Sequence, residues 1–313
     1  MIEVSNLVYE YPTKRALDGI TLSVRPQTIT ALVGPNGAGK TTLMRCMAAL
    51  EPPYEGEVRI AGLNTRHHPR AIHAQLGYLP DFFGLYDMLS VQRGLYFAAR
   101  AHGLDHAAAT KSTMTAAELV GLSDRLNVIA AELSRGLRQR LAIGQAIVHA
   151  PKVLLLDEPA SGLDPKARRD LSRLLVTLKK HGMTLVVSSH ILSELEDYSD
   201  EMIILDDGQV VGGVAMKLRQ DERPLLRVQL ASARSDLGGF LAAQTGVELV
   251  ESDTFFALFR FQGNAQARVR LVRRIVAEGF DVLSIGDAPR QLEETYFLET
   301  ANRAKKPPAK GPR

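Results

Sequence analysis

The chain has 313 residues, of which 45% are hydrophobic and 23% charged, and this is an ordinary globular composition with room for one large domain and a smaller one. Its net charge of +3 comes from the last thirteen residues, which hold five cations and no acid. Removing those five leaves −2, which excludes a basic nucleic-acid-binding protein by charge. The single cysteine, Cys46, excludes an intrachain disulfide, and no apolar run approaches the ~18–20 residues that a membrane span needs.

The first part of the chain mixes strand-like and helical patterns. Short β-branched, apolar segments in residues 1–33 predict strands, and residues 39–50 follow a helical pattern that two prolines end. A further strand is predicted at residues 57–62. Residues 90–122 are rich in Ala and Leu and predict helices broken at Gly103 and Gly121.

From Arg135 onward, helices and short apolar strands alternate. The predicted elements are a helix to about His149, a strand at 153–157, a helix at 166–180 and a strand at 184–188. Four-residue apolar strands between helices are typical of a parallel sheet that is covered on both faces. Asp207 and Gly208 then predict a hairpin between two strands.

The pattern changes near residues 219–224. The order after it, strand–helix–strand–strand–helix–strand, ends in a predicted helix at 290–301 and indicates a small α+β, ferredoxin-like domain. The expected organisation is a first domain at 1–218 with a helical insert at about 82–132, an accessory domain at 222–301 and a disordered basic tail at 302–313.

A glycine-rich segment, GPNGAGKTT, follows a predicted strand and opens a predicted helix. Its glycines let backbone N–H groups turn inward around phosphate oxygens, and the helix N-terminus adds a partial positive charge. Lys40 would reach the β- and γ-phosphates of a nucleotide, and Thr41 would coordinate Mg²⁺. The predicted nucleotide-binding residues here are Gly34, Pro35, Asn36, Gly37, Ala38, Gly39, Lys40, Thr41 and Thr42.

Two acids and a histidine follow apolar strands further on. Asp157 closes the strand VLLL and would place a carboxylate near the magnesium, and Glu158 comes next. His190 closes the strand TLVVSS. With residues 133–165 (LSRGLRQRLAIGQAIVHAPKVLLLDEPASGLDP), these segments resemble, in order, the motifs of ATP-binding cassette (ABC) ATPases, from residue 1 to about 218.

The resemblance implies an α/β P-loop NTPase fold of the ABC type with a helical subdomain, and ATP and Mg²⁺ as cofactors. It implies that Glu158 polarises the attacking water, that His190 contacts the γ-phosphate and that Tyr11 stacks on adenine. The alternative for Tyr11 is a surface side chain beside a proline.

Residues 133–140 resemble the LSGGQ signature of the family. Ser134 and Gly136 match it, whereas Arg135 replaces a glycine and Leu137 a glutamine. Ser134 can cap the helix that begins there. The resemblance implies that Ser134 and Gly136 meet the γ-phosphate of ATP bound by a second subunit, which requires an antiparallel homodimer. Arg135 could attract that phosphate or face solvent.

Asp81 departs from the family pattern, which usually has a glutamine at this position. A carboxylate is a stronger magnesium ligand than an amide, but it adds negative charge beside the phosphates. Asp81 is therefore predicted as a third Mg²⁺ ligand with Thr41 and Asp157. The alternative is that its side chain points away from the site.

The segment after Asp81, the shortened signature and the carboxyl-terminal extension most resemble ATPase subunits of ABC-2-type exporters. We therefore expect an ATP-hydrolysing subunit, peripheral on the cytoplasmic side of the cell membrane, that powers a separate permease by ATP-driven dimer closure. The insert at 82–132 would receive a permease loop.

Two alternatives stay open at this point. One is a permease-free ABC ATPase acting on ribosomes or DNA, which the body charge of −2 and the lack of a sustained heptad run disfavour, so no nucleic-acid partner is expected. The other is a regulatory module in which residues 222–301 bind a small molecule.

Overall fold

The computed structural model describes residues 1–190, 195, 198–215 and 224–287. They form two compact units, one before and one after residues 216–223. The predicted helix at 290–301 and the tail at 302–313 lie outside the described residues. Within those ranges, every helix is too short or too polar to cross a lipid bilayer.

The first unit begins with an antiparallel sheet in the order β2-β1-β4-β5. Its strands are β1 (Ile2–Tyr11), β2 (Lys14–Val24), β4 (Glu55–Ile60) and β5 (Leu63–Asn64). Ile2 and Val4 are buried whereas Glu3 and Ser5 are exposed, as expected for strands with one face on the core. The sequence predicts these strands, but not that they form a sheet of their own.

A second sheet of this unit has the order β10-β9-β3-β8-β7-β6. The strands β3, β6, β7, β8 and β9 run parallel, as predicted, and β10 pairs antiparallel with β9. Asp207 and Gly208 join β9 to β10 with φ angles of 43° and 73°, which confirms the predicted hairpin. The bounds are β3 Ile29–Val33, β6 Leu76–Leu79, β7 Val153–Leu156, β8 Thr184–Ser189, β9 Glu201–Asp206 and β10 Gln209–Ala215.

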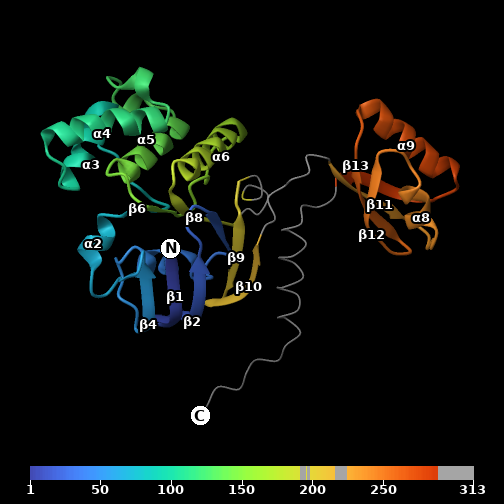
Figure 1. The fold of residues 1–313 in the computed structure, drawn as a ribbon, viewed down its shortest axis with the longest axis horizontal. Helices are drawn as coiled ribbons and strands as arrows, with labels where there is room; N and C mark the ends of the chain where they lie inside the picture. Colours follow the sequence, from blue (N-terminus) through green and yellow to red (C-terminus); the bar gives the residue numbers. More distant parts are fainter. Residues whose placement is uncertain (191–194, 196–197, 216–223, 288–313) are drawn as a thin grey trace, which may run out of the picture. The chain divides into compact units, whose positions relative to one another are not determined.

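The helices of this unit are α1 (Lys40–Met47), α2 (Pro69–His73), α3 (Val91–Ala101), α4 (His106–Leu119), α5 (Arg135–Ile147) and α6 (Pro165–Lys180). Ser90, Asp105 and Asp164 cap α3, α4 and α6 with their side chains. Gly103 and Gly121 have positive φ angles after α3 and α4, where the sequence predicts breaks. Figure 1 shows α3, α4 and α5 grouped together, away from β1, β2 and β4.

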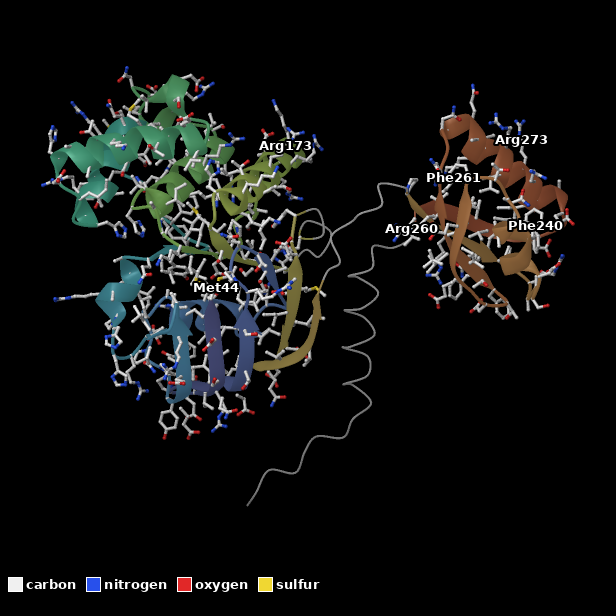
Figure 2. The ribbon with its side chains drawn as sticks, viewed as in Figure 1. Met44, Arg173, Phe240, Arg260, Phe261 and Arg273 are labelled. Atoms are coloured by element: carbon white, nitrogen blue, oxygen red, sulfur yellow. The ribbon has the colours of Figure 1, made fainter. Side chains whose placement is uncertain are left out.

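The main core of the first unit lies between the two sheets and α1, and Met44 belongs to it (Figure 2). Cys46 is fully buried in this core, and burial raises the pKa of its thiol to about 12. It is therefore a packing residue, as the sequence predicts.

The second unit contains a four-stranded antiparallel sheet in the order β12-β13-β11-β14. Its elements are β11 (Leu225–Leu230), α8 (Leu237–Ala242), β12 (Val247–Ser252), β13 (Phe256–Phe261), α9 (Ala265–Ala277) and β14 (Val282–Asp287). Phe261 lies in its separate core, Phe240 packs against that core, and Arg273 is exposed on α9 (Figure 2). The element order agrees with the sequence, and the assignment to the ferredoxin-like class stays a prediction.

Candidate active site

Four segments of the first unit meet at one edge of the parallel sheet. The strand β3 leads into the glycine-rich loop, β6 into Asp81, β7 into Asp157 and β8 into His190. Because β3, β6, β7 and β8 run parallel, their carboxyl ends lie at the same edge, and residues far apart in the sequence come together there.

The glycine-rich loop, residues 34–42, has a backbone that only glycine accommodates at several positions. Gly37 and Gly39 have φ angles of 81° and 105°. A side chain at Gly34 would overlap the backbone carbonyl of Leu205. Gly39 is the residue before α1, so the loop ends at a helix N-terminus whose free N–H groups favour an anion.

Lys40 is held within this loop and is only 7% exposed. Its Nζ donates to the carbonyl oxygens of Gly34 at 2.7 Å and Pro35 at 3.3 Å. It also lies 3.5 Å from Oε1 of Glu158. The ammonium therefore already sits between the loop and the second acid of the site.

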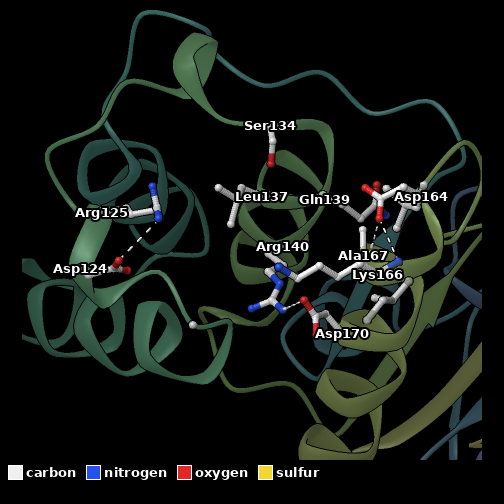
Figure 3. A pocket seen from close by; sticks show the side chains of 14 residues that line it. Asp124, Arg125, Ser134, Leu137, Gln139, Arg140, Asp164, Lys166, Ala167 and Asp170 are labelled. Carbon is white, nitrogen blue, oxygen red and sulfur yellow. Dashed lines mark hydrogen bonds and ion pairs between the residues drawn. The ribbon is translucent and has the colours of Figure 1, made fainter.

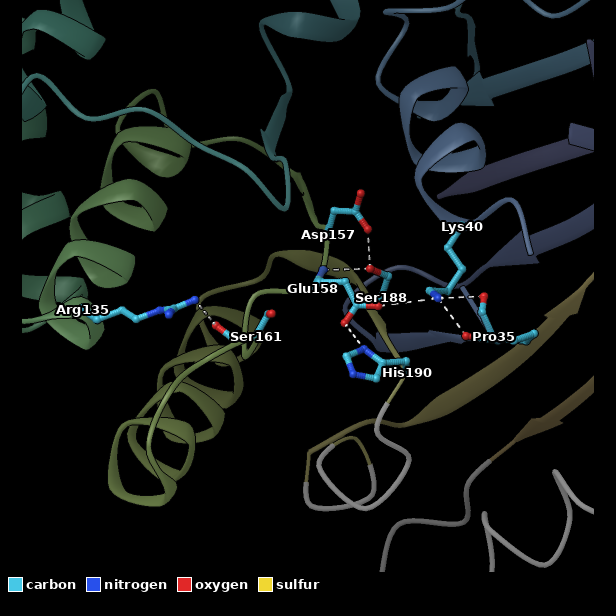
Figure 4. A network of polar contacts seen from close by, with 9 residues as sticks. Pro35, Lys40, Arg135, Asp157, Glu158, Ser161, Ser188 and His190 are labelled. Carbon is cyan, nitrogen blue, oxygen red and sulfur yellow. Dashed lines mark hydrogen bonds and ion pairs between the residues drawn. The ribbon is translucent and has the colours of Figure 1, made fainter. Parts of the chain in front are cut away.

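A hydrogen-bond network joins the two acids to β8 (Figure 4). The hydroxyl of Ser188 donates to Oδ1 of Asp157 at 2.5 Å and accepts from the backbone N–H of Glu158 at 2.8 Å. Oε2 of Glu158 lies 2.8 Å from Nδ1 of His190. Glu158 has a φ of 47°, a left-handed conformation that is unfavourable for this residue type and is common at functional sites.

Ser188 is the participant that the sequence reasoning missed. The register of the sheet contains the signal, because Leu156 on β7 is paired with Val187 on β8. The next residues on the two strands, Asp157 and Ser188, are therefore neighbours. With the strand register known, Ser188, two residues before the predicted His190, can be identified as the neighbour of Asp157.

The predicted magnesium ligands offer a suitable set of oxygen donors. Asp157 is 1% exposed, and its Oδ2 is buried without a hydrogen-bond partner in the described part of the chain. Thr41 lies in the first turn of α1, next to Lys40. Asp81 is an exposed residue, and partial desolvation, then the charges of Asp157 and Glu158, raise the pKa of its carboxyl, which lies within electrostatic reach of both acids. A hydroxyl and two carboxylates fit Mg²⁺, and an unpartnered buried oxygen is what such an ion would satisfy.

Tyr11 lies beside the glycine-rich loop at the end of β1. Its hydroxyl is 3.3 Å from Oγ1 of Thr42, and its ring packs edge-on against Tyr9 with centroids 5.1 Å apart. The ring is 39% exposed. It therefore offers a partly open aromatic surface next to the loop, while stacking on adenine stays a prediction.

Ser134 and Gly136 lie in a different place, at a pocket of about 440 Å³ between α5 and α6 (Figure 3). Ser134 occupies the position before α5, but its side chain caps no N–H of that helix, so the predicted cap is wrong. This turn is exposed, so water can satisfy its N–H groups and the hydroxyl is left open. A Cβ atom on Gly136 would lie 3.0 Å from Cβ of Ala167, so α5 packs closely on α6 there.

Comparisons with known proteins agree with this geometry. A family model described as "ABC transporter" matches residues 17–161. The bacitracin transport ATP-binding protein BcrA of Bacillus licheniformis is 28% identical over 310 residues, which cover 96% of each chain. The linearmycin resistance ATP-binding protein LnrL of Bacillus subtilis is 31% identical over 211 residues, 67% of this chain and 68% of LnrL.

A solved structure titled "Structure of ATP binding subunit of ABC transporter" is also similar. It is 31% identical with a TM-score of 0.61, and the match covers 69% of this chain and 90% of that chain. The chain therefore belongs to the ATP-binding proteins of the ABC transporter family, which are ATPases coupled to transport.

Proposed function

We propose that this ATPase powers a separate membrane permease that carries a substrate out of the cell, through ATP-driven closure of a homodimer. The observation that carries the proposal is the separation of two groups of residues. Lys40, Glu158 and His190 converge in one network. Ser134 lies at another surface of the same unit, and its hydroxyl caps no N–H of α5.

The converging group explains hydrolysis in a single active site. Lys40 and the backbone N–H groups of the glycine-rich loop other than Pro35 bind the phosphates of ATP. Glu158 orients the attacking water and accepts its proton, and His190 fixes the carboxylate of Glu158 through their hydrogen bond and reaches the γ-phosphate. Mg²⁺, when bound by Thr41, Asp157 and Asp81, supplies positive charge that neutralises the phosphate oxygens.

The second group explains why two copies are needed. Ser134 and Gly136 donate to the γ-phosphate of the ATP held by the other subunit, so a pair related by a twofold axis forms two identical composite sites. ATP favours the closed pair because it contacts both subunits only there, and hydrolysis allows the pair to reopen.

The surface after β6 fits contact with a permease. Phe82 and Met88 are 92% and 80% exposed, and the neighbouring Tyr86 packs edge-on against Phe97 on α3. Exposed apolar side chains gathered in one segment are typical of an interaction surface. Residues 82–132 would thus receive a permease loop and hold the protein at the cytoplasmic face of the membrane. Export is supported by the names of BcrA and LnrL, which concern bacitracin transport and linearmycin resistance.

The test of this function is a variant that binds ATP but does not hydrolyse it. In Glu158→Gln the side chain keeps its size but loses the base, so we expect turnover to fall about 100-fold or more. The variant should then accumulate as an ATP-bound dimer in size-exclusion chromatography with Mg²⁺ and ATP. Glu118→Gln, on the exposed face of α4, is the matched control. Normal turnover, or a monomer at saturating ATP, would overturn the proposal.

A further inference from the structure

Arg135 makes its contacts within its own subunit. Its Nη2 donates to the carbonyl oxygen of Ser161 at 3.0 Å, across 26 positions of sequence. The guanidinium also covers Gly162, because any side chain at Gly162 would overlap it. Gly162 has a φ of 65°, so this glycine both permits the turn and leaves the space that Arg135 fills. Arg135 is exposed, in line with the solvent-facing expectation, but its guanidinium also holds the turn at 161–162, and the contact with the partner's phosphate stays a prediction.

The segment that Arg135 contacts leads directly back to the active site. The N–H of Ser161 donates to the carbonyl oxygen of Glu158 at 3.0 Å. Further along, Asp164 caps α6, and Gly136 packs against Ala167 in the first turn of that helix. The first turn of α5 is therefore joined to the segment 158–167 at two points (Figure 4 shows the contact of Arg135).

We propose that Arg135 is a positioning residue that couples the signature turn, residues 134–136, to Glu158 of the same subunit. This inference rests on the proposed function, in which Ser134 serves the partner's ATP while Glu158 serves its own. A displacement of Ser134 when it meets that ATP would pass through Arg135 and Ser161 to the backbone of Glu158. The two composite sites then hydrolyse ATP cooperatively, because each signature turn senses one nucleotide and positions the base for the other.

The planar guanidinium is what the contact requires. It donates to the carbonyl oxygen of Ser161 through Nη2 and fills the space that a Cβ atom at Gly162 would need. A lysine keeps the charge but lacks the planar group with its several N–H donors. Arg135→Lys therefore separates the role of shape from the role of charge.

The experiment measures ATP hydrolysis of Arg135→Ala and Arg135→Lys against Arg173→Ala, an exposed arginine on α6, as the control. We expect kcat to fall about tenfold in Arg135→Ala, as for the loss of one hydrogen bond from a charged donor, and the Hill coefficient to fall toward 1. Binding of a fluorescent ATP analogue to the monomer, and the melting temperature, should match the wild type. Arg135→Lys should behave like Arg135→Ala.

A double variant tests whether Arg135 acts through Gly162. Gly162→Ala strains the turn in both backgrounds because of its positive φ, and it also displaces the guanidinium when Arg135 is present. It should therefore lower kcat more in the wild-type background than when Arg135 is already alanine. Fully additive effects would contradict the coupling. The coupling would also be contradicted if Arg135→Lys retained normal kcat while Arg135→Ala only raised KM. That result would indicate a direct charge contact with the partner's phosphate.

Failure of the coupling can be told apart from failure of the proposed function. If the wild type forms no ATP-dependent dimer, the proposed function fails and the coupling fails with it. If the wild type dimerises and hydrolyses cooperatively while Arg135→Ala does the same at the wild-type rate, only the coupling is overturned.

Discussion

Ser188 holds together the two acids that end β7. Its single hydroxyl donates to Asp157 and accepts from the N–H of Glu158, which has a left-handed backbone. The same oxygen thus fixes one carboxylate and stabilises the strained residue beside it. Both acids depend on a neighbour that carries no charge.

Removing this hydroxyl should slow hydrolysis more than it weakens ATP binding. In Ser188→Ala, Glu158 loses the acceptor of its N–H and Asp157 loses a donor, while the loop around Lys40 keeps its contacts. We expect kcat to fall about tenfold, the effect of one lost hydrogen bond to a charged group, with a smaller change in KM. Steady-state kinetics checks this. Ser188→Thr retains a hydroxyl and is the control, and an equal loss in kcat and binding would contradict the assigned role.

Asp81 should affect the dependence of hydrolysis on magnesium. Partial desolvation and the charges of Asp157 and Glu158 raise the pKa of Asp81, so its carboxylate lies in the electrostatic field of both acids. In Asp81→Ala we expect the Mg²⁺ concentration for half-maximal activity to rise about tenfold, as for loss of a metal-binding contact. A magnesium titration of ATPase activity measures it, with Asp81→Gln as the family-like comparison. An unchanged rate and Mg²⁺ dependence would remove Asp81 from the metal site.

The sequence predicts the residues of local motifs better than the contacts between distant segments. Glycines, Lys40 and consecutive acids form motifs whose order along the chain is visible before the structure. Ser188, and the contact of Arg135 with Ser161, depend on strand register and on where a flexible side chain comes to rest. Neither quantity is fixed by local spacing, so a single sequence cannot supply it.

At the scale of elements, a stacked pair of histidines joins the ends of two helices. His102 follows α3 and His149 follows α5, and their rings lie 3.7 Å apart with an interplanar angle of 8°. Nε2 of His149 bonds the carbonyl oxygen of Leu76, so this nitrogen carries the proton, while Nδ1 is buried without a hydrogen bond in the described residues. This arrangement suits a neutral imidazole.

The stack predicts a loss of stability in mild acid. Burial, then the charge of His102, lowers the pKa of His149 to about 4, against 6.5 in the unfolded chain. The unfolded state therefore binds a proton first as the pH falls. The stabilisation is complete above pH 6.5 and is lost toward pH 4, with a slope of at most about 1.4 kcal/mol per pH unit from this group.

Replacing His149 should flatten this dependence. The side chain in His149→Gln keeps an N–H donor for Leu76 but does not titrate in this range, so the free energy of unfolding should fall less steeply between pH 6.5 and 4. Urea unfolding at a series of pH values measures the slope, and His67→Gln, an exposed histidine, is the control. Equal slopes in wild type and His149→Gln would contradict the assignment.

The ends of helices can be predicted from the sequence, whereas the pairing of strands cannot. Caps and glycines set the ends of α3, α4 and α6, and these helices begin and end close to the predicted positions. The separate antiparallel sheet of β1, β2, β4 and β5 was not predicted, because apolar alternation identifies strands but not their partners.

In the part of the whole molecule that the structure describes, the main core of the first unit is separate from the core of the second unit. One extends through β1, β2, α1 and the parallel sheet of the first unit, and the other lies between the sheet and helices of the second unit. No residue belongs to both cores among those that the structure describes. Because each unit has its own core, we expect each to unfold in its own cooperative transition.

A substitution in the second core should leave the ATPase unit intact. Phe259 on β13 is fully buried, and Phe259→Ala should destabilise the second unit by about 3–5 kcal/mol through lost burial and a cavity. In calorimetry the transition of that unit should move to lower temperature, while the other transition and the rate of ATP hydrolysis stay at wild-type values. Phe255→Ala, at a residue that is 50% exposed, should change neither transition measurably. If Phe259→Ala instead lowered both transitions together, the two units would share one folding equilibrium, and the accessory unit would contribute directly to the stability of the active site.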